Sequence, residues 1–193
     1  MPNKIKYGLK SVYYAVGTPG ANNTMTYGTP VAIPGAVNLS LDPQGDSTPF
    51  YADNIVYYQG TANTGYEGDL EIALIPDSFK TDVLGFITDG KDVLVEDAEA
   101  ATVHFALLFQ FEGDSKATKH VLYNCTAARP TVAGATKEAS IEPQTETLSI
   151  TATTVYFATV DTEVVKAEAN EDSDSTTYSG WTTTVYTPIA PST

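Results

Sequence analysis

Apolar and polar positions alternate through most of the chain, and this pattern predicts a fold made mainly of β-strands. The clearest case is AVNLSLD at 36–42, where Val37, Leu39 and Leu41 alternate with polar residues. In 139–157, aliphatic residues likewise alternate with threonine and serine. The same pattern predicts further strands at 4–17, 64–75, 92–97, 102–114 and 118–130.

The stretches 102–114 and 118–130 are expected to form an antiparallel hairpin, because the turn sequence GDSKA separates them. Strict alternation in the second strand places Val121, Tyr123 and Cys125 on one face. His120, Leu122, Asn124 and Thr126 then fall on the other face.

In the stretch TGYEGDLEIALIPDSFKTDVLGF at 64–86, the spacing of the apolar residues changes halfway from strand-like to helix-like. In its first part Glu67, Asp69 and Glu71, here called the acidic stripe, fall on one face of an extended chain. The opposite face, expected to meet the core, carries Tyr66, Leu70, Ile72 and Leu74. A row of carboxylates buried without cations would cost several kcal/mol, so we expect the acidic stripe to face water.

The second part of this stretch predicts one short helix. Residues 76–78, Pro-Asp-Ser, form a turn and helix-start signal, and Gly85 stands where a helix would end. Between them Phe79, Val83 and Leu84 recur at helical spacing. We expect this helix to follow the strand directly.

Two segments interrupt the regular pattern. Residues 43–65 are rich in turn formers yet hold six large apolar residues, so we expect this extension to dock against another surface. The alternative is that its aromatics complete the chain's own core. The tail is expected to begin as a short helix or strand, to become an acidic loop at 168–177, and to pack an aromatic-bearing end on a core or on another subunit.

Length and charge narrow the function classes. A chain of 193 residues is most simply one domain, here taken as 1–193 with an extended loop at 42–63 and a C-terminal extension or arm at 157–193.

Ten basic and 24 acidic residues give a formal charge of −14, which opposes binding to nucleic acid or to an anionic membrane. A single cysteine excludes an intrachain disulfide framework. No apolar stretch approaches a membrane span, so we expect no membrane anchor.

Candidate chemistry is sparse, and we expect neither an enzyme nor a cofactor. His104 and His120 lie on neighbouring predicted strands, where two polar-face residues are favoured over a metal or acid–base site. Asn170, Asp172 and Asp174 begin like a calcium loop, but the glycine and glutamate that such a loop needs are missing. The acidic stripe has carboxylates at strand spacing, as a glycosidase would require, but a solvated face explains it more simply.

Six blocks of sequence together resemble the major tail tube protein of long-tailed bacteriophages that infect Gram-positive bacteria. They are KIKYGLKSVYYAV, YGTPVAIPGAVNLSLDPQGDSTPFYADNIVYY, GYEGDLEIALIPDSFKTDVLG, HFALLFQFEGD, HVLYNCTAARP and KEASIEPQTETLSITAT. The resemblance covers most of residues 3–156, and the region after 157 is less distinctive.

This resemblance implies an antiparallel β-sandwich or barrel-like subunit with one flanking helix, a long loop and terminal arms. Such subunits form hexameric rings that stack into a tube, through which double-stranded DNA passes without specific binding. The implied partners are other copies of the chain and the tape-measure, tail terminator and distal tail proteins. The implied location is the virion tail, after synthesis and assembly in the host cytoplasm.

The resemblance also implies roles for particular residues. The acidic stripe would line the channel. A ring-stacking loop within 42–63 would include Asp46, Phe50, Tyr51, Tyr57 and Tyr58, and Trp181 and Tyr186 would make a C-terminal contact. The alternative function is a monomeric β-sandwich module that binds carbohydrate through exposed tyrosines and Trp181.

Overall fold

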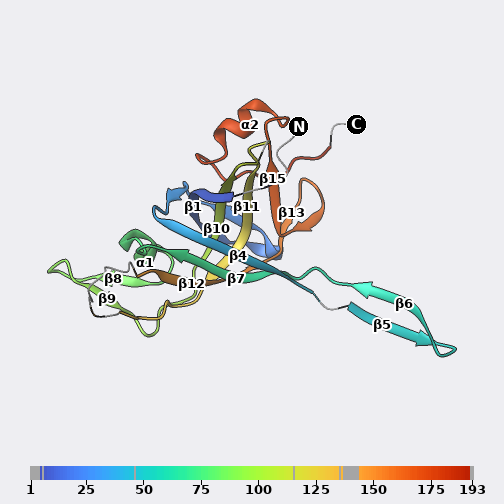
Figure 1. Ribbon diagram of the computed structural model, residues 1–193, viewed down its shortest axis with the longest axis horizontal. Coiled ribbons are helices and arrows are strands. Elements are labelled where there is room, and N and C mark those ends of the chain that lie inside the picture. The colour runs from blue at the N-terminus through green and yellow to red at the C-terminus, as the bar shows by residue number, and fades with distance from the viewer. Residues whose placement is uncertain are drawn as a thin grey trace.

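The computed structural model describes residue 5, residues 7–45, 47–114, 116–134 and 136, and residues 144–191. Within these ranges the chain is mainly β, with antiparallel sheets and two short α-helices, so the predicted fold class is confirmed (Figure 1). The main sheet is built from β1 (Tyr7–Pro19), β2 (Met25–Tyr27), β3 (Val31–Ala32), β4 (Ala36–Gln44), β7 (Gly65–Ile72), β10 (His104–Glu112), β11 (Lys119–Ala127), β12 (Glu146–Thr153) and β15 (Lys166–Ala169). The other elements are η1 (Ala21–Asn23), β5 (Ser47–Ala52), β6 (Ile55–Thr61), α1 (Asp77–Asp82), β8 (Phe86–Thr88), β9 (Leu94–Glu96), β13 (Val155–Phe157), β14 (Thr162–Val164) and α2 (Ser175–Gly180).

The main sheet is curled and forked. Its strands lie in the order β2-β1-β10-β11-β12-β7-β4, with β3 beside β1 and β15 beside β11. The fork lies at β11, where β12 pairs with residues 124–127 and β15 pairs with residues 119–122. Because β1 also contacts β4, the sheet curls around one of its faces.

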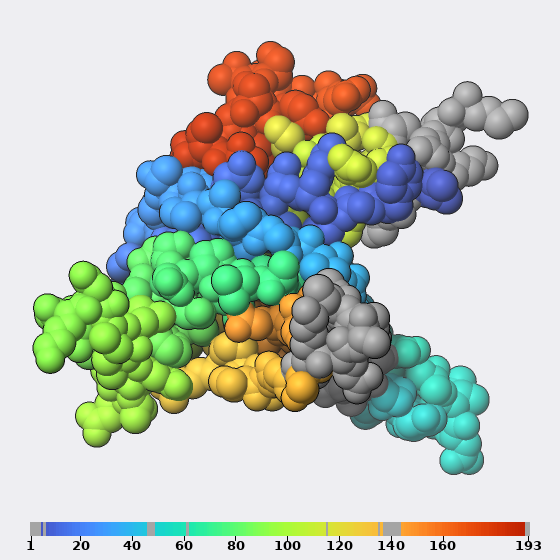
Figure 2. Space-filling model, turned by 60° about the vertical axis from the view of Figure 1, so that its left-hand side comes forward, coloured from blue at the N-terminus to red at the C-terminus, as the bar shows by residue number. Residues whose placement is uncertain are grey.

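Two hydrophobic cores lie on the two faces of this sheet, and alternate residues of β10 enter each of them. Phe105 and Leu107 pack in the first core, which also contains Phe79 of α1. Ala106 and Leu108 pack in the second core. The C-terminal segment covers the second core, and Figure 2 shows it in orange and red along the top of the molecule. The fold is therefore layered about its central hairpin, β10–β11.

A register shift in that hairpin overturns one detail of the predicted alternation. Phe105 pairs with Cys125 and Leu107 pairs with Leu122, so β11 holds one extra residue at this point. Such a bulge reverses the faces beyond it. Cys125 therefore lies in the first core, and the expectation that it shares a face with Val121 and Tyr123 is wrong.

Two further apolar residues of the alternating patterns are exposed. Val37 is 53% exposed because the pairing of β4 with β7 shifts between Ala36 and Asn38. Leu74 is 66% exposed because β7 ends at Ile72 and the chain turns toward α1.

The predicted helix at the end of this stretch is present as α1. Its Phe79 is 1% exposed and meets the Tyr14 ring edge-on, with centroids 5.0 Å apart. The Tyr14 hydroxyl donates to Asp82 Oδ2 at 2.8 Å. Burial and the Asp82 carboxylate raise the pKa of Tyr14 to about 12. Gly85 has a φ of +73°, and a Cβ there would lie 2.4 Å from Ala100 Cβ, so the turn after α1 requires glycine.

The tail is more regular than predicted. The expected acidic loop at 168–177 is wrong at both ends, because β15 extends to Ala169 and α2 begins at Ser175. The Asp174 carboxylate accepts from the Thr177 amide at 2.8 Å and so caps α2. Among the helices described, none has the length and apolar character needed to cross a bilayer.

Candidate functional site

The acidic stripe lies on β7 between β12 and β4, on a sheet face that the C-terminal segment leaves uncovered. Glu67 pairs with Thr151 of β12, Asp69 with Ser149 and Glu71 with Thr147. On the other side the partners in β4 are Asp42, Ser40 and Asn38, in the same order. Three polar rows therefore run side by side across this face.

Hydroxyl groups from the β12 side hold two of the three carboxylates. Ser149 Oγ donates to Asp69 Oδ1 at 2.7 Å, and Thr145 Oγ1 donates to Glu71 Oε1 at 2.6 Å. A hydroxyl donor fixes a carboxylate without neutralising it. The uncharged face predicted for β12 therefore orients the acidic stripe and leaves its charge in place.

The charge of this face is of one sign. Strands β4, β7 and β12 place four acidic residues on this face, the acidic stripe and Asp42, and they contain no lysine or arginine. Within the described part of the chain, no basic side chain forms an ion pair with the acidic stripe, and no group of three or more His, Cys, Asp and Glu has the geometry to hold a metal ion. A solvated face with this charge repels anions such as phosphate.

The other face of β7 anchors the acidic stripe to the first core. Leu70 and Ile72 are fully buried there. Gly68 lies between Glu67 and Asp69 in β7. A Cβ at this position would stand 1.9 Å from the backbone oxygen of Ser40. Strands β4 and β7 thus approach closely because residue 68 has no side chain.

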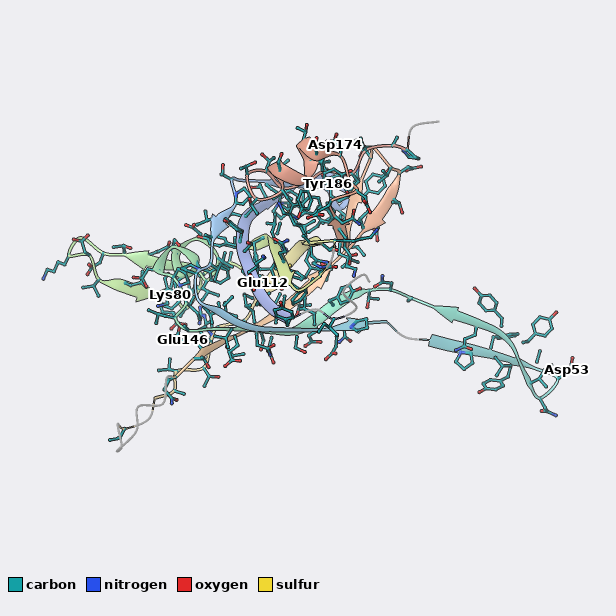
Figure 3. The ribbon with its side chains drawn as sticks, turned by 45° about the horizontal axis from the view of Figure 1, so that its top comes forward. Asp53, Lys80, Glu112, Glu146, Asp174 and Tyr186 are labelled. Atoms are coloured by element: carbon teal, nitrogen blue, oxygen red, sulfur yellow. The ribbon has the colours of Figure 1, made fainter. Side chains whose placement is uncertain are left out.

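The segment predicted to dock is a two-stranded hairpin, β5–β6, here called the aromatic hairpin. Its turn is formed by Asp53 and Asn54, both with φ near +60° (51° and 62°), as a tight two-residue turn requires. The hairpin projects from one end of the body, with Asp53 at its tip and its side chains splayed to both sides (Figure 3). Asp46, predicted to belong to this loop, lies outside the described residues.

The large apolar side chains of the aromatic hairpin point into solvent. Phe50 is 60% exposed, Tyr51 63%, Tyr57 72% and Tyr58 67%, and Ile55 and Val56 are also exposed. Within one copy of the chain they belong to neither core, so the alternative that they complete the chain's own core is wrong. Four rings at this exposure offer on the order of 500 Å² of apolar surface, divided between the two sides of the hairpin, and exposed apolar surface of this extent often marks an interaction site.

Trp181 and Tyr186 pack on the second core of the same chain. Trp181 is 2% exposed, stacks on Tyr186 with centroids 5.4 Å apart, and donates from Nε1 to the backbone oxygen of His120 at 3.3 Å. Nearby, the Lys119 ammonium lies 4.1 Å from the centre of the Tyr178 ring. A buried indole is not available to stack on a sugar, so the carbohydrate-binding alternative loses its tryptophan.

The two histidines occupy different places on the β10–β11 hairpin. His104 Nδ1 lies 2.7 Å from Asn124 Oδ1, whereas His120 stacks on Phe109 and lies 3.3 Å from the Glu168 carboxylate. They do not share a site, which agrees with the preference for two separate polar-face residues.

A cavity of about 340 Å³ at the fork of the sheet was not predicted. Apolar residues of β4 and β10 line it together with His120, Lys166 and Glu168. The hydrogen bond between Lys166 and Glu168 raises the pKa of the lysine and lowers that of the glutamate, so both stay charged and largely neutralise each other. The sequence alone could not reveal this cavity. Lys166 and Glu168 belong to β15, which comes beside β11 only when the two strands pair in the folded chain.

The geometry thus presents an anionic sheet face and an apolar projecting hairpin on one chain. Comparison with protein-family models and with curated proteins gave no match to this chain.

Proposed function

We propose that this chain is a structural subunit of a bacteriophage tail tube, which assembles as hexameric rings and stacks into a conduit for double-stranded DNA. The observation that carries the proposal is the aromatic hairpin, with four exposed rings on a segment that projects from the body (Figure 1). Exposed apolar surface of this kind often marks a site that a partner covers.

The partner that fits best is another copy of the same chain. The whole subunit is strongly acidic, with a formal charge of −14, and charge alone would keep copies apart. The aromatic hairpin, Ser47–Thr61, contains one charged residue, Asp53, and so escapes most of this repulsion. Contact between unlike surfaces of identical copies generates rings or filaments.

The acidic stripe fits the inner wall of such a tube. A wall of carboxylates held by hydroxyl donors repels the phosphates of DNA and offers no cation to bind them. DNA could then slide without adhering. In this proposal the other partners are the tape-measure, tail terminator and distal tail proteins, no cofactor takes part, and the protein is made in the host cytoplasm before it enters the virion tail.

The test is negative-stain electron microscopy of the purified protein over a concentration series, with light scattering on the same samples. Hollow tubes or rings are expected as concentration rises. Monomers at every concentration, together with binding in a glycan screen, would instead favour the carbohydrate-binding module.

A further inference from the structure

A second exposed apolar surface lies at the end of the molecule opposite the aromatic hairpin. It consists of Ile87, Val93 and Val95 in the β8–β9 hairpin, here called the aliphatic patch, and these residues are 56%, 52% and 41% exposed. Figure 1 shows β8–β9 and β5–β6 at the two ends of the long axis, and Figure 2 shows the two hairpins projecting from opposite sides.

The aliphatic patch is a single face of its hairpin. Ile87 pairs directly with Val95, and Val93 falls on the same side by alternation. The opposite face turns toward the body, where Phe86 packs against the first core. The hairpin is thus anchored through one face and presents three aliphatic side chains on the other.

Leu74, which is 66% exposed, enlarges the apolar surface at this end, because it lies in the turn between β7 and α1. Nothing in the described part of the chain covers either exposed surface. The two surfaces also differ in chemistry, one being aromatic and the other aliphatic, and aromatic rings pack well on β-branched side chains.

We infer that the aliphatic patch of one copy is the acceptor for the aromatic hairpin of the next copy. This inference rests on the proposed function and names the surface to which the hairpin binds. The two surfaces lie at opposite ends, so a copy cannot cover its own hairpin, and a symmetric pair joined hairpin to hairpin would leave both aliphatic patches exposed. A head-to-tail contact uses both surfaces of every copy and continues along the long axis.

Charge is compatible with this contact. The aromatic hairpin has one acidic residue, Asp53, at its tip, and the turn of β8–β9 carries Lys91 between Asp89 and Asp92. The Asp89 carboxylate is engaged, since Oδ1 accepts from the amides of Lys91 and Val93 at 2.8 and 2.9 Å. The turn therefore carries one ammonium against two carboxylates, a net charge of −1, so it adds little repulsion to the approach of a hairpin whose single charge is Asp53.

The experiment is disulfide cross-linking between two single-cysteine additions. One copy carries Tyr57→Cys in the aromatic hairpin, and the other carries Ile87→Cys in the aliphatic patch. The native Cys125 does not interfere, because it is fully buried and burial raises the pKa of its thiol to about 12. Val132→Cys, at a position that is 98% exposed and outside both surfaces, serves as the matched control for random collision.

Mixing the Tyr57→Cys and Ile87→Cys copies under mild oxidation should give about a tenfold excess of the mixed dimer over either homodimer, because contact raises the effective thiol concentration. The mixture of Tyr57→Cys with Val132→Cys should not show this excess. Dominant Tyr57→Cys homodimers would indicate a symmetric contact and overturn the inference.

The same samples separate the two proposals. Tubes of the unsubstituted protein without the mixed cross-link would remove the aliphatic patch as acceptor and leave the tube proposal standing. The mixed cross-link in samples that never form rings or tubes would support the contact and count against the tube.

Discussion

Removing two rings from the aromatic hairpin should weaken assembly without weakening the subunit. Phe50 and Tyr58 lie directly opposite each other in the hairpin and are 60% and 67% exposed, so they present a joint surface to a partner. A large aromatic side chain buries about 200 Å² when fully covered, so each ring has on the order of 100 Å² left to bury. At about 25 cal/mol per Å², complete burial of both rings is worth at most about 5 kcal/mol.

Association recovers only part of that value, because ordering of side chains and of the hairpin offsets it. If about 3 kcal/mol remain, the Phe50→Ser/Tyr58→Ser variant should assemble at a critical concentration about 100-fold higher than the unsubstituted protein. The critical concentration is measured by light scattering across a dilution series, with electron microscopy of the same samples.

Thermal unfolding of the unassembled variant supplies the control. Exposed residues outside a core usually change the free energy of unfolding by less than about 0.5 kcal/mol, so the melting temperature of the subunit should hardly move. An unchanged critical concentration would refute the argument that these rings bind a partner. A large drop in melting temperature would show that they stabilise the subunit itself.

Three further predictions follow from other parts of the structure. Replacing the acidic stripe by its amides should leave assembly intact and slow DNA ejection from reconstituted particles, most of all at low ionic strength, whereas unchanged ejection kinetics would remove the channel-lining role. Gly68→Ala should lower the free energy of unfolding in denaturant titrations by about 1–3 kcal/mol, because the added Cβ meets the Ser40 oxygen, while Gly90→Ala, with open space around it, should have little effect. The thiol of Cys125, whose pKa is raised to about 12, should stay unreactive toward a thiol reagent at pH 8 until the chain unfolds, and rapid labelling of the folded protein would contradict its burial.

The alternation of apolar and polar residues correctly predicted which residues are buried in strands whose pairing has no register shift. In β12 every second residue is polar, and Leu148, Ile150 and Ala152 lie in the first core as expected. The prediction failed for Cys125 because the bulge that moves it to the other face arises from the pairing of two strands. The helix α2 was missed because it is six residues long, has no buried residue and depends on the Asp174 cap.

For the candidate site, sequence located the residues but not their surroundings. The acidic stripe was visible because carboxylates at alternate positions of a strand must share a face. Its hydroxyl partners Ser149 and Thr145 were not, because they lie more than 70 residues away and meet the stripe only through the β7–β12 register. The two-stranded form of the aromatic hairpin was not predicted, because the turn formers in 43–65 indicated a loop.

The aromatic hairpin, the acidic stripe and the β8–β9 hairpin follow one another along the chain. Strand β7 receives the chain from the aromatic hairpin and passes it on to α1 and β8, so the acidic stripe lies between the two surfaces that we infer to join (Figure 1). A head-to-tail contact therefore leaves the acidic face free and places the stripes of successive copies one after another. Like charges at this spacing oppose the contact, although salt screens them beyond about 8 Å at physiological ionic strength. The attraction must then come from apolar surface. This accounts for a 15-residue hairpin with a single charged side chain, in a chain of charge −14, at a place where copies are inferred to meet.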